Sequence, residues 1–287
     1  MNLIAESQKL QNYLKAKDFK TVVYGCEKLL NKFPNNPFLF NLLALALHGN
    51  GNYLIAIDKF KRALDLDPNF LPAKNNLANS YKAIGNFEKA EFYYKDVLKI
   101  KPNYVQALNN YANLKTLIFD YDSAIELYTK ALKVNENDET ILFTLANAYH
   151  AIGETQKTKE IITKILKLNP KHVSAHKLLS SIIDYSKDVT NLNQMESVIS
   201  EKDLSNAQII DLSFAIGKAY EDLKNFEKSF LYIEKANKVK KIDVNFNIIK
   251  EKTFFESIKN SFQKFNFNIE KKIFNKIKPI FICGMPR

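Results

Sequence analysis

The sequence predicts an all-α solenoid built from helical hairpins, and three observations lead to this prediction. The pattern of residues 71–104, LPAKNNLANSYKAIGNFEKAEFYYKDVLKIKPNY, returns every 34 residues. Apolar residues inside each unit follow the spacing i, i+3/i+4, i+7, which is typical of one face of a helix. Small and loop residues keep the same step from unit to unit, namely Ala56, Ala90 and Ala124, Gly51, Gly85 and Gly153, and Pro34, Pro68, Pro102 and Pro170. A fixed period of this length indicates stacked repeats.

Five 34-residue units are expected over residues 1–170. One hairpin cannot bury its apolar face alone, so neighbouring units are expected to share their stability. The expected packing residues include Leu10, Val22 and Cys26 in the first unit, Leu43, Ala44 and Phe60 in the second, Leu77, Ala78 and Tyr94 in the third, Tyr111, Ala112 and Tyr128 in the fourth, and Leu145, Ala146 and Ile162 in the fifth.

The repeat resembles the tetratricopeptide repeat (TPR), a helix–turn–helix unit that stacks into a right-handed superhelix. The resemblance is close over residues 3–170 and loose over residues 171–236. It departs from the family at the fourth position of each unit, where the family commonly carries Trp. This chain has no Trp and places Phe40, Lys74, Leu108 and Leu142 there.

Residues 171–236 are expected to form degenerate or capping units. A helix is predicted over Val173–Tyr185, followed by an interruption over Asp188–Asn193 and a short helix around Met195–Ile199. A further helix is predicted from Ser205 to about Leu223, and the repeat pattern recovers over residues 213–237. Because the end units of a solenoid are commonly atypical, residues 186–236 are expected to be a cap or a docking surface.

Residues 237–278 are expected to form a basic, Phe-rich linker helix. The chain carries a net charge of +11, and its last fifty-one residues hold eleven Lys and one Arg against four acidic residues. This excess favours an anionic partner or a solvated Lys-rich helix. Core packing is the expected role of its apolar stripe, which consists of Phe254, Phe255, Ile258, Phe262 and Phe265.

Residues 279–287, PIFICGMPR, change the pattern from helical to extended. Ile280–Cys283 is a continuous apolar run flanked by Pro and Gly, which predicts a buried strand. A buried strand needs neighbours for its backbone hydrogen bonds, and the sequence contains no other convincing strand. The expectation is that this chain is the front part of a longer protein, in which a second domain begins here. The alternative is an apolar tail packed on the last repeat.

The strand and the Gly-Met-Pro-Arg that follows resemble the start of the sulfotransferase signature, and residues 212–230 together with 279–287 resemble bacterial TPR sulfotransferases. This resemblance implies an α/β domain that uses 3′-phosphoadenosine 5′-phosphosulfate (PAPS) as sulfuryl donor. It implies that Gly284 and Pro286 shape the phosphosulfate loop and that Arg287 contacts the donor and serves catalysis. This chain lacks the rest of that site and is expected to be inactive by itself.

Asparagines recur on the first helix of successive units, at positions expected to line the inner face. They are Asn41, Asn75 and Asn109, Asn79, Asn113 and Asn147, and Asn76 and Asn110. An amide offers a donor and an acceptor, so it can pair with a peptide backbone of any sequence. The rows resemble the asparagine ladder of the repeat domain in O-GlcNAc transferase. They predict a groove for an extended polypeptide. The alternative for these rows is that Asn is simply frequent in this chain. The alternative to a sulfotransferase is a non-enzymatic interaction scaffold that binds an extended peptide in its concave groove.

Other classes of site receive little support from the sequence. Cys26 and Cys283 suggest neither a disulfide framework nor a metal site. His172 and His176 share an i, i+4 spacing but lack a third ligand, so no metal is expected and the histidines are expected on the surface or in the groove. No apolar run approaches the length of a membrane span. A cytoplasmic setting without nucleic-acid or membrane partners is expected.

Overall fold

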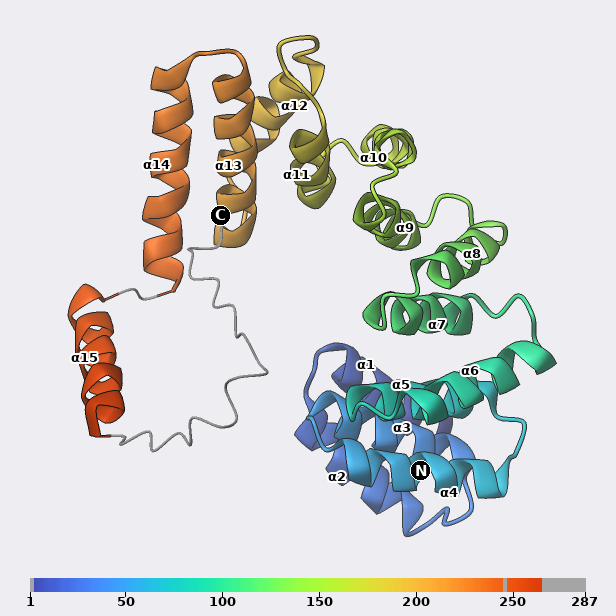
Figure 1. Cartoon of the computed structure of the whole chain (residues 1–287). Coiled ribbons are helices and arrows are strands. Elements are labelled where there is room, and N and C mark those ends of the chain that lie inside the picture. Colours follow the sequence, from blue (N-terminus) through green and yellow to red (C-terminus); the bar gives the residue numbers. More distant parts are fainter. Residues whose placement is uncertain (1–2, 245–246, 265–287) are drawn as a thin grey trace, which may run out of the picture.

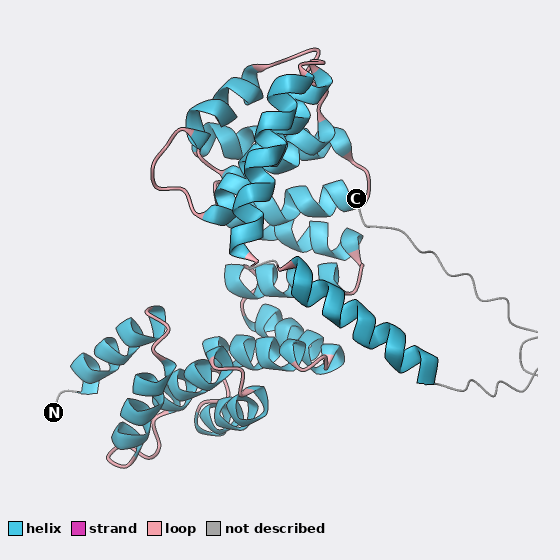
Figure 2. Cartoon of the chain, turned by 90° about the vertical axis from the view of Figure 1, so that its left-hand side faces the viewer, coloured by secondary structure: helices cyan, strands magenta, loops and turns pink. Residues whose placement is uncertain are grey.

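A computed structural model describes residues 3–244 and 247–264, and all secondary structure in these ranges is helical (Figures 1 and 2). The all-α prediction is confirmed for this part of the chain. The helices are α1 (Leu3–Lys15), α2 (Phe19–Leu30), α3 (Pro37–Gly49), α4 (Tyr53–Leu66), α5 (Leu71–Ala83), α6 (Phe87–Ile100), α7 (Val105–Leu117), α8 (Tyr121–Leu132), α9 (Glu139–Ala151), α10 (Thr155–Leu168), α11 (Val173–Ile182), α12 (Thr190–Ile199), α13 (Asn206–Asp222), α14 (Phe226–Asp243) and α15 (Ile248–Lys264).

Consecutive helices pair into antiparallel hairpins, and the hairpins stack into a curved solenoid (Figure 1). The first helices of neighbouring hairpins touch along the series α1, α3, α5, α7 and α9. In Figure 1, α7, α9 and α11 lie toward the inner side of the arc, and α8 and α10 lie on its outer side. The first helix of each hairpin therefore supplies the inner surface, as expected for this architecture.

Small residues allow the close helix crossings that the sequence predicts. Ala56, Ala90 and Ala124 have no exposed surface, and Phe60 and Tyr94 beside them are equally buried. Apolar clusters run through successive hairpins rather than forming one central core. Each hairpin thus buries its apolar face against its neighbours, which makes stability a sum of local and interface contributions.

One turn position requires a left-handed backbone in six of the hairpins. Gly51, Gly85 and Gly153 occupy it with φ of +83°, +77° and +79°. The equivalent residues of three other hairpins are not glycines but have φ of 58° or 63°, and they are Lys17, Phe119 and Lys224. A side chain in this region costs about 1–2 kcal/mol relative to glycine. The stacking of the repeats therefore imposes the left-handed conformation at this turn even where the residue is not glycine.

The sixth hairpin departs from the predicted boundaries. The helix α11 ends at Ile182 instead of Tyr185, and α12 begins at Thr190, within the predicted interruption. Tyr185 leaves the helix because its ring is fully buried and its hydroxyl donates to Asn191 Oδ1 at 2.7 Å. The start of α12 is stabilised by Asp188, whose carboxylate accepts from Thr190 N at 2.8 Å. The prediction from Ser205 to Leu223 is confirmed, since these two residues cap α13.

The helix α15 lies apart from the stacked hairpins in Figure 1. Phe254 and Phe255 are 58% and 65% exposed, so the expected core packing of this stripe is wrong for the described part of the chain. Phe265, the predicted strand Ile280–Cys283 and the loop residues Gly284, Pro286 and Arg287 lie outside the described residues. Within the described ranges, no helix has the length and apolar character needed to cross a bilayer.

Candidate binding surface on the inner helices

Four of the inner-face asparagines bond to one another across hairpins. Asn76 Nδ2 donates to Asn41 Oδ1, and Asn110 Nδ2 donates to Asn75 Oδ1, each at 3.1 Å. Both bonds join residues 35 positions apart, so they link α3 to α5 and α5 to α7. Asn41 and Asn75 are only 6% and 5% exposed. These amides hold neighbouring hairpins together. The groups that make these bonds are therefore not available to a ligand, although the sequence alone assigns them to one.

The amide series stops between the fourth and fifth hairpins. The next donor in the series would stand at position 144, where the chain has Thr instead of Asn. Thr144 Oγ1 donates to Ile141 O in its own helix at 2.9 Å. Asn109 Oδ1 is consequently buried without a hydrogen-bond partner. A buried acceptor without a partner costs about 1–3 kcal/mol, so this junction is a weak point of the stack.

The second row of asparagines is oriented by buried tyrosines from the second helix of the same hairpin. Tyr94 Oη donates to Asn79 Oδ1 at 2.5 Å, and Tyr128 Oη donates to Asn113 Oδ1 at 2.6 Å. Burial raises the pKa of both phenols, so both remain protonated donors at neutral pH. The carbonyl oxygen of each amide is occupied, and its N–H groups have no partner among the described residues. Each amide therefore presents a donor.

Asn147 continues this row in sequence but differs in its contacts. The position fifteen residues later is Ile162, which offers no hydroxyl. The side chain of Asn147 is exposed, and its Nδ2 donates to Phe143 O of the same helix at 2.8 Å. The fifth hairpin therefore lacks the oriented amide of the third and fourth. A Tyr fifteen residues after the Asn is the sequence signal that separates the two cases.

A basic pair lies beside these amides at the C-terminal ends of α3 and α5. Burial lowers the pKa of the Lys82 amine, and burial together with the Lys82 charge lowers the pKa of His48. His48 Nδ1 lies 2.9 Å from Ser80 Oγ, which itself donates to Asn76 O. Because the Ser80 hydroxyl donates its proton to Asn76 O, His48 Nδ1 is the donor in its contact with Ser80 Oγ. The half-buried position of His48 agrees with the expectation that this histidine lies on the surface or in the groove.

The prediction that all four histidines lie on the surface or in the groove is wrong for His176. This residue is fully buried, and its Nε2 lies 2.8 Å from Pro170 O. Its Nδ1 lies 2.7 Å from Asn191 Nδ2, whose Oδ1 accepts from Tyr185. Because an amide nitrogen can only donate, Nδ1 accepts and Nε2 donates to the carbonyl. His176 is thus a neutral structural link between α11 and α12.

Comparison with known proteins agrees with an α-solenoid built from helical repeats. Profiles of the tetratricopeptide repeat match residues 47–115, 119–182 and 210–243, more than half of the chain. The chain belongs to the tetratricopeptide-repeat family. No curated protein sequence matches it closely enough to be counted as a relative.

Solved structures of similar fold include three bacterial proteins. The C-terminal part of a TPR repeat-containing protein from Cytophaga hutchinsonii has a TM-score of 0.61 at 13% identity, over 81% of this chain and 95% of that one. PilF from Pseudomonas aeruginosa has a TM-score of 0.57 at 17% identity, over 71% and 96%. A tetratricopeptide repeat protein from Parabacteroides merdae has a TM-score of 0.55 at 19% identity, over 88% and 96%. At these identities the likeness concerns the fold.

Proposed function

We propose that the inner face of the solenoid binds an extended polypeptide by its backbone. The observation that carries this proposal is the pair of tyrosine-oriented amides at Asn79 and Asn113, one hairpin apart. Their available N–H groups pair with peptide carbonyl oxygens, which every residue of a partner provides. Affinity from such contacts depends little on the side chains of the partner.

The eight predicted asparagines take different parts in this proposal. Asn79 and Asn113 donate to the peptide, and Asn147 joins them after releasing its own-helix contact. Asn76 and Asn110 border the groove while bridging hairpins, and Asn41 and Asn75 support the stack from inside. Asn109 holds the corresponding place at the junction where the bridging bond is absent. Lys82 adds a cation next to the donors, which favours a peptide with an acidic residue at that point.

The test uses a fluorescein-labelled, carboxymethylated polypeptide that cannot fold, and measures its binding by fluorescence anisotropy. Replacing Asn79, Asn113 and Asn147 together by Ala should weaken binding by about tenfold or more, since two or three hydrogen bonds of about 1 kcal/mol each are lost. The control replaces Asn12, Asn103 and Asn193, which are exposed and lie away from this row. Equal affinity of the wild type and the Asn79/Asn113/Asn147 variant would remove the proposal.

We further propose that this scaffold serves a PAPS-dependent sulfotransferase. The resemblance of residues 279–287 to the phosphosulfate loop supports this second candidate, with Gly284, Pro286 and Arg287 at the donor. The exposed Phe254 and Phe255 also support it, because such a stripe fits packing against a surface that the described residues do not supply. The solenoid would then recruit the acceptor for sulfuryl transfer.

Donor binding tests this candidate directly. The full-length gene product should bind PAPS in a calorimetric titration, and the chain of 287 residues should bind none. Arg287→Ala in the longer product should weaken donor binding, because a charge-assisted contact to phosphosulfate is lost. In the sulfotransferase signature, Ser-Gly-Thr-Thr follows Gly-x-Pro-Arg. Absence of donor binding by the longer product, or a continuation of the gene unlike Ser-Gly-Thr-Thr after Arg287, would leave only the polypeptide-binding scaffold.

A further inference from the structure

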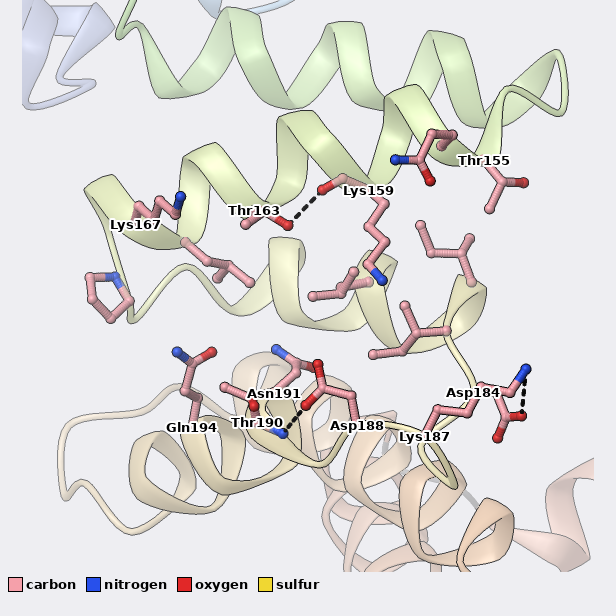
Figure 3. A pocket seen from close by; sticks show the side chains of 16 residues that line it. Thr155, Lys159, Thr163, Lys167, Asp184, Lys187, Asp188, Thr190, Asn191 and Gln194 are labelled. Carbon is pink, nitrogen blue, oxygen red and sulfur yellow. Dashed lines mark hydrogen bonds and ion pairs between the residues drawn. The ribbon is translucent and has the colours of Figure 1, made fainter.

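A cleft of about 770 Å³ lies between α10 and the segment that joins α11 to α12 (Figure 3). Its volume is in the range of small-ligand and peptide sites. The floor is aliphatic and includes Leu166, Leu179, Ile182 and Ile183. The cleft borders α10, a second helix on the outer side of the arc, so it is separate from the asparagine-lined inner face (Figure 1).

The wall formed by residues 183–191 is held away from α10 by contacts with α13 and α11. Lys218 Nζ donates to Ile183 O at 2.6 Å, and Tyr185 N donates to Asp222 Oδ2 at 3.1 Å. Asn191 is fixed between Tyr185 and His176. Because these contacts are buried or partly buried, the cleft is a built part of the sixth hairpin and not a gap between mobile side chains.

The charged side chains of the two walls differ in whether they have nearby partners. On α10, Lys159, Thr163 and Lys167 follow one another at four-residue steps and so share one side of the helix (Figure 3). Neither lysine has an ion-pair partner among the residues that the structure describes. On the opposite wall, Asp184 pairs with Lys187 at 3.8 Å, and Asp188 accepts from the backbone at the start of α12. Hydrogen bonding to Thr190 lowers the pKa of Asp188, and Asp188 is also near enough to Lys159 for the Lys159 charge to contribute to this lowering. Neither ammonium group of α10 is held in an ion pair with these acids, so both can approach an external anion.

We propose that this cleft binds an extended peptide with aliphatic side chains between two acidic residues. Eight residues along α10 separate Lys159 from Lys167, which is about 12 Å at 1.5 Å per residue. An extended peptide rises about 3.3 Å per residue, so carboxylates four residues apart match this separation and lie on the same face of the peptide. A small dicarboxylate is too short to reach both ammonium groups. The aliphatic floor takes the side chains between the two acids, and the occupant is therefore a protein segment.

The test is a fluorescence anisotropy titration with the labelled peptide Gly-Ser-Asp-Leu-Ile-Leu-Glu-Ser-Gly. The wild-type chain should bind it saturably. The double variant K159Q/K167Q should bind it about tenfold more weakly or worse, because two charge-assisted contacts are lost. The matched control K99Q/K133Q removes the same charge from exposed positions of α6 and the end of α8, and should bind like the wild type. Circular dichroism checks that all variants remain folded.

Two further arms distinguish binding in this cleft from binding elsewhere on the chain. A peptide with Asn and Gln in place of Asp and Glu, and one with Ser in place of the aliphatic residues, should each lose most of the binding. The Asn79/Asn113/Asn147→Ala variant should keep it. The proposal is overturned if the wild type does not bind the acidic peptide, if both Lys pairs lower the affinity equally, or if the neutral peptide binds as well. Loss of binding in the asparagine variant would likewise overturn it and assign the peptide to the inner face.

Discussion

Replacing Thr144 by Asn should stabilise the solenoid by completing the amide series at its broken junction. In the third and fourth hairpins, Asn76 and Asn110 each donate to an Asn 35 residues earlier at 3.1 Å. Position 144 has the same relation to Asn109, whose Oδ1 is buried without a partner. An Asn at 144 is therefore placed to make the missing bond.

The expected gain is about 1 kcal/mol in the free energy of unfolding, the net value of one buried hydrogen bond. The hydrogen bonds that Thr144 loses to carbonyls of its own helix concern groups that the backbone already satisfies. Its side chain also interacts with the Tyr128 hydroxyl, which keeps its bond to Asn113 when Thr144 is replaced. With a urea dependence of about 2–3 kcal/mol per molar, the midpoint should rise by about 0.3–0.5 M. Urea unfolding followed by circular dichroism measures this shift.

Two variants make the reasoning refutable. Asn110→Thr creates at the previous junction the situation that exists at position 144, since it removes the partner of Asn75 Oδ1. It should destabilise the chain by about 1–3 kcal/mol. Thr144→Ser keeps a hydroxyl and adds no bridging amide, so it should not stabilise. If Thr144→Asn leaves the midpoint unchanged while Asn110→Thr lowers it, the orphan oxygen of Asn109 is not what weakens this junction.

Three other predictions concern turns and titrating groups. Lys224→Gly should stabilise the chain by about 1 kcal/mol because Lys224 has φ of 58°, whereas Gly85→Ala, at φ of +77° with open space around it, should destabilise it by a similar amount in urea unfolding. Burial lowers the pKa of His176, so the unfolded chain binds this proton more readily, and stability that is complete above pH of about 6.5 should fall below it. Because the pKa of His48 is lowered as well, His176→Gln should reduce this pH dependence between pH 7 and 5 without abolishing it, whereas an unchanged slope would contradict the assignment. Burial opposes ionisation of Glu91, but hydrogen bonds from Lys95, Tyr111 and Lys115 outweigh this effect and lower the pKa of Glu91 to about 2. The contribution of Glu91 to the free energy of unfolding should therefore be complete above pH of about 4.5 and lost as the pH falls toward 2. Glu91→Gln should remove that acid dependence, and a wild-type acid profile in this variant would refute the assignment.

The 34-residue period carries enough information to predict the helices and their crossings. It fixes where Ala56, Ala90 and Ala124 must be small, and the structure buries all three completely. It also predicts the turn at Gly51, Gly85 and Gly153. It does not reveal that Phe119 and Lys224 adopt the same left-handed backbone, because there the stacked hairpins impose a conformation that the residue itself disfavours.

The sixth hairpin and the asparagine rows show what the period could not predict. The path of residues 183–189 depends on Lys218 and Asp222, which are more than thirty residues away in sequence. Identical asparagines also differ in role, because their partners lie 15 or 35 residues away. Asn113 meets a tyrosine and Asn147 does not. The sequence identifies the inner face, but the Tyr fifteen residues after an available Asn is recognised as a signal only once the structure shows the hydrogen bond between the two.

Site-specific photo-crosslinking is the most direct test of the claim that the inner face holds an extended polypeptide. Benzoylphenylalanine would replace Ala83 or Leu117, which are exposed and lie one helical turn beyond Asn79 and Asn113. The matched outer positions are Lys95 on α6 and Thr129 on α8, both exposed. The account predicts that the carboxymethylated polypeptide is captured at Ala83 and Leu117 and hardly at Lys95 and Thr129. Equal capture at all four positions, or capture only at the outer pair, would contradict it.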